Sequence, residues 1–237
     1  MTYLRRNLAA PAGTLPALTF SDGTLEALKW LGLFLMTLDH VNKYLLHSEA
    51  VLLFDPGRVV MPIFAIVLAY NLARPDAVDR AAYPRVMQRM AIAGVLATPP
   101  FIALGGLGWG WWPLNIMFTL LVATGVLYLS QGGKIGRVLA VGLFIIGGAF
   151  VEFWWPALAI TVGAWSYFRR PSWTALLLAL IGLAALFFIN KNLWALAALP
   201  LFVLASRVDL PVPRLRWIFY AFYPLHLAGI WLLRNAA

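Results

Sequence analysis

The chain has 237 residues, of which 62% are hydrophobic and only 11% charged, and its mean hydropathy is +0.83. Soluble domains carry roughly 25% charged and 45–50% apolar residues, so the composition excludes a soluble domain. The formal net charge is +9, but most Lys and Arg lie in short loops between apolar runs, which favours a role in membrane topology over nucleic-acid binding. The absence of cysteine excludes disulfides, thiolate metal sites and a cysteine nucleophile.

The N-terminal tail, residues 1–24, is the one extended polar stretch of the chain. It contains Arg5 and Arg6 followed by Pro11 and Pro16, without the apolar core of about 7–15 residues that a secretory signal requires. We therefore expect the tail to stay attached and cytoplasmic. Residues 25–237 are predicted to form a single membrane-embedded domain, because too little sequence separates the apolar runs for a second, soluble domain.

The apolar runs that follow are long enough to cross a hydrocarbon core of roughly 30 Å as helices. Breaks at proline, glycine and charge clusters predict spans near residues 25–47, 58–73, 85–104, 113–130, 136–152, 155–168, 173–189, 192–206 and 216–234. Ser21 or Asp22 is predicted to cap the first helix. The fold class is therefore all-α, a polytopic integral membrane bundle of about nine transmembrane helices. Lys and Arg concentrate in the tail and every second loop, which predicts a cytoplasmic N-terminus and an outside C-terminus.

The first span carries ionisable residues that a simple anchor would not tolerate, since such groups usually mark function inside a membrane. Lys29 and His40 are eleven residues apart, which places them on one helix face with an axial separation of about 16 Å. Lys29 lies near the cytoplasmic end and His40 lies deeper. We predict that this face links a cytoplasmic anion to chemistry within the membrane, with His40 as a general base.

Asp39 points about 100° away from His40 around the helix and is expected to pair with a basic residue of a neighbouring helix. Arg58 is the candidate. The alternative interpretation is that Asp39 and Arg58 form a buried ion pair that only holds the first two helices together, with His40 hydrogen-bonded in the bundle.

Further polar residues occur in or beside the other spans: Asn115 where the fourth span begins, Glu152 where the fifth ends, and His226 within the last. Glu152 is interpreted as a second acid or base, or as a group that binds an amine, or as a solvated carboxylate beside an aromatic belt. The cluster of Arg80, Arg85 and Arg89 either binds phosphates or marks a cytoplasmic loop.

Five segments of the chain together resemble a known family: residues 27–40, 57–65, 83–90, 114–120 and 219–227. That family is TraX, a family of membrane proteins of conjugative plasmids. The family is similar to the wider transmembrane acyltransferases, in which an Arg and a His stand ten intervening residues apart on the first helix. Here Lys29 replaces the Arg and the spacing is kept.

The resemblance implies a multi-pass enzyme of the bacterial inner membrane that transfers acetyl from acetyl-CoA to the N-terminal amine of a membrane-inserted conjugative pilin, without metal. The catalytic residues that the resemblance implies are His40, Asp39, Arg58 and Asn115, to which the polar pattern of the spans adds Glu152 as a second acid or base. Acetyl-CoA binding is assigned to Lys29, Arg85 and Arg89, and substrate binding to Lys43 and His226. Two alternatives are another pilin-maturation reaction, such as head-to-tail cyclisation, and a non-catalytic partner that binds or inserts pilin. A proton-coupled transporter is disfavoured, because no inverted repeat is visible.

Overall fold

The computed structural model describes residues 15–77, 81–105 and 111–236, and within these ranges the chain is helical and contains no strand. An isolated bridge between Leu114 and Val151 is the one β-type pairing there. Arg5, Arg6 and Arg80 lie outside the described residues. The elements in chain order are α1 (Asp22–Tyr44), α2 (Val51–Gly57), α3 (Val60–Ala73), η1 (Pro75–Ala77), α4 (Ala82–Ala103), α5 (Ile116–Ser130), α6 (Gly133–Phe150), α7 (Trp154–Arg169), α8 (Trp173–Ala185), α9 (Phe187–Asn190), η2 (Trp194–Ala197), α10 (Ala198–Ala205) and α11 (Ile218–Ala236).

The helices follow the predicted spans closely, and the differences are shifted helix ends, the additional helix α2, and a division of the spans 173–189 and 192–206 into two elements each. Ser21 caps α1, since its hydroxyl accepts a hydrogen bond from the Thr24 backbone N–H at 3.2 Å. The fourth span begins three residues later than predicted because Asn115 is the N-cap of α5. The second predicted span, 58–73, corresponds to α3. The short helix α2 before it was not predicted, and a break at Arg58 and Val59 separates the two helices.

In the described part of the chain, four helical segments are long and apolar enough to cross a membrane: Phe54–Ala73, Ala82–Ala103, Gly133–Phe150 and Trp173–Asn190. Ile116–Ser130 and Trp194–Ala205 are shorter apolar helices. The 23-residue helix α1 differs from these because it carries five charged side chains. The chain is thus a helical membrane protein, while the number of crossings and the side on which each end lies remain predictions.

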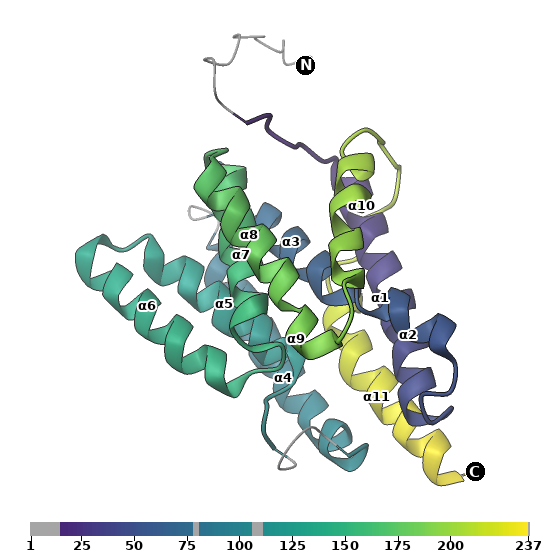
Figure 1. Cartoon of the computed structure of the whole chain (residues 1–237). Coiled ribbons are helices and arrows are strands. Elements are labelled where there is room, and N and C mark those ends of the chain that lie inside the picture. The colour runs from purple at the N-terminus through teal and green to yellow at the C-terminus, as the bar shows by residue number, and fades with distance from the viewer. Residues whose placement is uncertain (1–14, 78–80, 106–110, 237) are drawn as a thin grey trace.

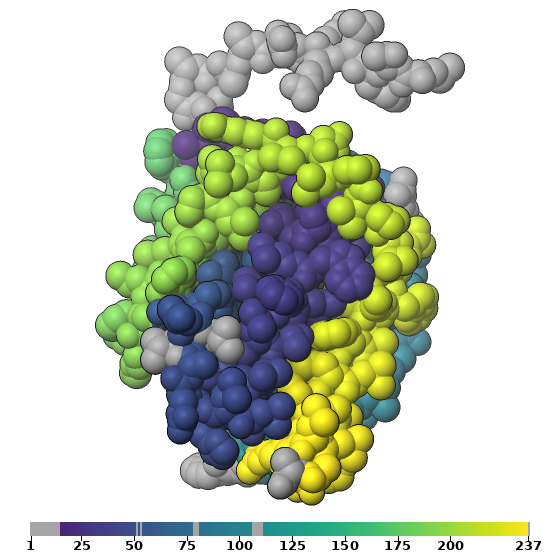
Figure 2. Space-filling model, turned by 90° about the vertical axis from the view of Figure 1, so that its right-hand side faces the viewer, coloured from purple at the N-terminus to yellow at the C-terminus, as the bar shows by residue number. Residues whose placement is uncertain are grey.

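Helix α1 occupies one side of the bundle, next to α2, α3 and α11 (Figure 1). Figure 2 shows it on the surface of that side, between α11 and α2, with the segment that precedes α11 above its first turns. That segment is fixed to α1 by Thr24, whose hydroxyl donates to the Val208 carbonyl at 2.7 Å and accepts from the Leu210 N–H at 3.2 Å. The start of α11 is thereby held beside the start of α1.

On the other side of the bundle, α7 packs between α3 and α8, and α5 packs against α4 and α6 (Figure 1). Helices α7 and α8 approach closely, since a Cβ added at Gly182 of α8 would lie 2.8 Å from the Ile160 backbone nitrogen. Small residues allow this close approach when there is no hydrophobic driving force between helices in lipid. Helix α4 also packs against α11.

Candidate functional site

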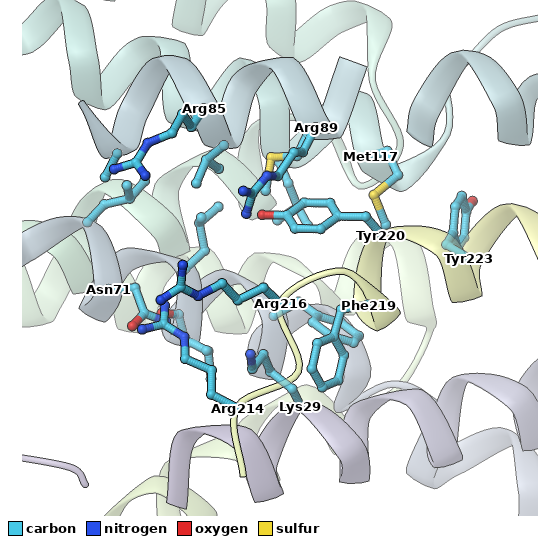
Figure 3. A pocket seen from close by; sticks show the side chains of 18 of the residues that line it. Lys29, Asn71, Arg85, Arg89, Met117, Arg214, Arg216, Phe219, Tyr220 and Tyr223 are labelled. Atoms are coloured by element: carbon cyan, nitrogen blue, oxygen red, sulfur yellow. The ribbon is translucent and has the colours of Figure 1, made fainter. Parts of the chain in front are cut away.

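A cavity of about 300 Å³ lies where α1, α4 and α11 begin and α3 ends (Figure 3). We call it the basic cavity, because among its described lining residues there are six cations and a single carboxylate, Asp76. The cations are Lys29, Arg74, Arg85, Arg89, Arg214 and Arg216. Figure 3 shows Arg85 and Arg89 entering from α4, across the space from Lys29 of α1 and from Arg214 and Arg216.

Aromatic rings of α11 and its preceding turn hold two of these cations. The Arg89 guanidinium lies 4.3 Å from the ring centroid of Trp217, and the Lys29 ammonium lies 4.2 Å from that of Phe219. Lys29 also donates to the buried carboxylate of Glu26 at 2.6 Å, and the same oxygen lies 3.8 Å from Arg214 Nε. These contacts join α1, α4 and α11 around the cavity.

The chemistry of this lining suits a ligand with several negative charges. Guanidinium groups form bidentate hydrogen bonds with phosphates, and several of them facing one space repel one another until an anion is bound. Arg74 is already paired with Asp22, and Lys29 with Glu26. Arg89 and Arg216, by contrast, have no carboxylate partner among the described ion pairs.

A second cavity of about 210 Å³ lies further along α1, and we call it the histidine cavity. Its polar lining residues are Asp39, His40, Lys43, Tyr44, Ser48, Arg58, Glu152 and Tyr223. Met36, Ile116 and Tyr223 line both cavities, so the two spaces adjoin at these three residues. Lys29 and His40 both contact α11, which confirms that they share one face of α1.

His40 is hydrogen-bonded to His226 of α11, with 2.6 Å between His40 Nδ1 and His226 Nε2. The rings are parallel to within 1° and their centroids are 4.9 Å apart, farther than the two nitrogens, so the rings lie edge to edge. His226 Nδ1 in turn lies 3.1 Å from the Phe222 carbonyl oxygen. His40 lines the histidine cavity, whereas His226 lines neither cavity.

Asp39 and Arg58 form the predicted ion pair, which joins α1 to the break between α2 and α3. Both side chains are largely buried, with 15% and 16% of their surface exposed. Arg58 is also held by Phe54, whose carbonyl accepts from Nε at 3.3 Å and whose ring centroid is 4.3 Å away. Gly57 permits this approach, since a Cβ there would lie 2.7 Å from the Asp39 Cβ and Cγ.

Glu152 lies in the three-residue connection between α6 and α7, and its backbone is fastened to the start of α5. Its N–H donates to the Leu114 carbonyl at 2.8 Å, and its carbonyl accepts from the Thr119 hydroxyl at 2.7 Å. Burial raises the pKa of the Glu152 carboxyl from its usual 4.5 to about 7, although Lys43 and Arg58 act in the opposite direction. This carboxyl can therefore exchange a proton near neutral pH.

The other sequence-predicted residues separate into two groups. Lys43 lines the histidine cavity as an exposed side chain, and Arg85 and Arg89 line the basic cavity. Asn115 lines neither cavity: its amide oxygen caps α5 at Met117 N, and its amide nitrogen donates to the Gly94 carbonyl at 3.0 Å. This geometry gives Asn115 a structural role and leaves Arg58, rather than Asn115, as the candidate donor to a reacting group.

Sequence reasoning did not assign Arg214 and Arg216 to the site, because their position in a loop already accounted for them as topology signals. Their place directly before the motif at residues 219–227 was the signal that could have included them. Tyr44 and Tyr223 were also missed, since buried tyrosines in apolar helices resemble ordinary core residues. His226 was found, but its contact with His40 was not.

Fold and site together define a helical membrane protein in which a cationic cavity adjoins a cavity with a histidine pair and a carboxyl that titrates near neutrality. A family model described as "TraX protein" matches residues 24–234, so the chain belongs to the TraX family. The "Protein TraX" of Escherichia coli strain K12 is 33% identical over 110 residues, which are 46% of this chain and 41% of that protein. A second "Protein TraX" of Escherichia coli is 31% identical over 110 residues, with the same coverage of 46% and 41%. The aligned stretch thus spans about two fifths of the length of these curated relatives. No solved structure matches the chain.

Proposed function

We propose that this protein is an acetyltransferase of the bacterial inner membrane, which transfers acetyl from acetyl-CoA to the N-terminal amine of a conjugative pilin. The observation that carries the proposal is the contact between the basic cavity and the histidine cavity at Met36, Ile116 and Tyr223. A donor with phosphates at one end and a reactive thioester at the other requires a cationic region for the phosphates and an adjoining catalytic region for the thioester. Membership of the TraX family supports the same conclusion.

In this proposal the basic cavity opens to the cytoplasm, as the concentration of Arg at this end predicts. Arg89, Arg214 and Arg216 bind the phosphates of acetyl-CoA, and Lys29 adds a fourth cation on α1. The acyl end passes Met36, Ile116 and Tyr223 to reach His40. Acetyl-CoA supplies the activated thioester, so no enzyme nucleophile and no metal are needed.

The reaction in the histidine cavity is a direct acyl transfer. The amine nitrogen attacks the thioester carbonyl, the new C–N bond forms as the C–S bond breaks, and the thiolate of CoA leaves. The amine proton passes to Nε2 of His40, the ring nitrogen not engaged with His226. Arg58, which lines the cavity beside Asp39, donates to the developing oxyanion. Glu152 lies in the connection between α6 and α7, and Lys43 lies at the outer end of α1. Both line the histidine cavity, and the acceptor enters beside them.

Intact-mass spectrometry of the pilin made with each variant tests the proposal. With the wild-type protein, pilin is expected to gain the mass of one acetyl group. His40→Asn is expected to lower the rate of acetylation by about 10²–10⁴-fold, the usual contribution of a general base. His47→Asn is the matched control, because His47 is exposed and lines neither cavity, and asparagine tolerates its positive φ of 51°.

The same measurement separates this proposal from its alternatives. Pilin that loses the mass of one water in the presence of the wild-type protein has been cyclised. Unchanged pilin mass, together with no thermal stabilisation of the purified protein by acetyl-CoA, would establish a non-catalytic partner. Full acetylation by the His40→Asn variant would remove His40 from the mechanism.

A further inference from the structure

Both ring nitrogens of His226 are hydrogen-bonded, one to the Phe222 carbonyl and the other to His40. Its Nδ1 lies 3.1 Å from the Phe222 carbonyl oxygen, and a carbonyl can only accept, so this nitrogen carries the proton. A neutral imidazole has a single N–H. Nε2 of a neutral His226 is therefore bare and accepts a hydrogen bond from His40 across the 2.6 Å contact.

The same count fixes the protons on His40. Since His40 Nδ1 donates to His226, a neutral His40 has its proton on Nδ1 and an unprotonated Nε2. The opposite tautomer would place two bare nitrogens against each other, without a hydrogen atom between them. Doubly protonated His226 would reverse the contact and place a proton on His40 Nε2, which would then be unable to accept one.

The surroundings of His226 suit a residue that orients rather than binds. Its ring is flanked by Phe222 and Tyr223 of its own helix, with ring centroids 5.1 Å and 5.6 Å away, and it lines neither cavity. When His40 becomes an imidazolium, its Nδ1–H bond to His226 becomes charge-assisted and stronger. A carboxylate would orient the base in the same way, but an imidazole does so without placing a negative charge within the membrane helices.

We propose that His226 is a positioning residue, which accepts a hydrogen bond from His40 and thereby keeps His40 Nε2 free to receive the proton of the acceptor amine. This inference rests on the proposed acetyl transfer, and it replaces the substrate-binding role that the sequence predicted for His226. The hydrogen bonds from the Phe222 carbonyl through His226 to His40 thus determine which nitrogen of His40 is free to accept the proton.

The tautomers are measured directly by nitrogen NMR of the full chain in detergent or nanodiscs, with ¹⁵N-labelled histidine and His47→Asn to remove the exposed third imidazole. Both remaining histidines are expected to be neutral with the proton on Nδ1, so no assignment is needed. A neutral Nε2–H imidazole or a doubly protonated ring at neutral pH would overturn the proposal. This readout does not use acetyl transfer, so it decides the tautomer even if the proposed function fails.

Steady-state kinetics with acetyl-CoA and a pilin peptide test the consequence. His226→Phe keeps a planar ring but removes the acceptor, and it is expected to lower kcat by about 10- to 100-fold with little change in either KM. His226→Gln offers an amide oxygen to His40 and is expected to recover part of kcat. Wild-type kcat in His226→Phe, or a raised KM with unchanged kcat, would contradict a positioning role.

Discussion

In the basic cavity, cations from α1, α4, the residue after α3 and the segment before α11 line one space, whereas in the histidine cavity Asp39 and Arg58 face each other as a pair. Each region also contains a contact between an aspartate and an arginine. The Asp22–Arg74 pair lies at the basic end, with side chains 61% and 31% exposed, against 15% and 16% for Asp39–Arg58. The same chemical pair is thus present in solvent and in the protein interior. The comparison indicates that charge at the basic end is available for a ligand, and that charge in the histidine cavity also maintains the structure.

The largest expected difference comes from removing one charge of each pair. Asp39→Asn leaves Arg58 without its partner in a largely buried place, and we expect the free energy of unfolding to fall by about 3 kcal/mol. Asp22→Asn changes an exposed pair, which is expected to cost at most about 1 kcal/mol. Thermal or denaturant unfolding of the purified protein in detergent measures both. Equal losses in the two variants would remove the distinction between the cavities.

A glycine beside the buried pair gives the next effect. In Gly57→Ala the new Cβ would lie 2.7 Å from Asp39, so the pair or the end of α2 must shift, at an expected cost of about 2 kcal/mol. Gly142→Ala in α6 is the control, because a Cβ there meets nothing within 4 Å and alanine favours a helix over glycine. The same unfolding experiment is expected to show a loss for Gly57→Ala and none for Gly142→Ala. An unchanged Gly57→Ala variant would show that the pair has room to move.

The two regions also differ in how far the sequence could predict them. Helical phase placed Lys29 and His40 on one face, and both contact α11. Because an unpaired charge within a membrane helix is costly, the sequence predicts a basic partner for Asp39, and Arg58 lies only 19 residues away. The first inference depends on local helix geometry, and the second depends on charged residues being scarce within the spans. The sequence alone contains both kinds of information.

What the sequence could not supply is the convergence of distant segments. His40 and His226 are 186 residues apart, and no periodicity within α1 or α11 indicates that their rings meet. Arg214 and Arg216 reach the basic cavity because Thr24 fastens the segment at Val208 and Leu210 to α1. Asn115 shows the reverse case, a polar residue at a helix start whose capping bonds leave it no place in either cavity.

The excess of cations in the basic cavity predicts a charge-dependent affinity for acetyl-CoA. Arg89→Gln removes one charged donor and is expected to weaken binding about tenfold, since a hydrogen bond to a charged group contributes roughly 1.5 kcal/mol or more. Arg137→Gln is the matched control, because Arg137 is exposed on α6 and lines neither cavity. Calorimetric titration of the purified protein with acetyl-CoA gives both values of Kd. Equal Kd values for the two variants would show that the phosphates bind elsewhere.

The pH-dependent effect concerns the one carboxyl of the histidine cavity that has no salt bridge among the described residues, Glu152. Burial raises its pKa to about 7, so the native state keeps a proton that the unfolded chain loses near the usual value of 4.5. Between these two values the native state binds more protons than the unfolded state, and the free energy of unfolding therefore falls as the pH rises, by up to about 1.4 kcal/mol per pH unit. Above about pH 7 both states are ionised and this contribution no longer changes.

Glu152→Gln is expected to flatten that slope between pH 4.5 and about 7, because glutamine keeps the shape of the protonated carboxyl and does not titrate. The melting temperature in detergent, followed across this range, is expected to fall more steeply for the wild type than for the variant. Glu49→Gln, which changes an exposed carboxylate, is expected to keep the wild-type slope. Parallel curves for wild type and Glu152→Gln would mean that Glu152 is ionised throughout. The histidine cavity would then resemble the basic cavity in containing a charge that is free to pair with a ligand. In this case the Glu152 carboxylate would pair with the ammonium of the acceptor.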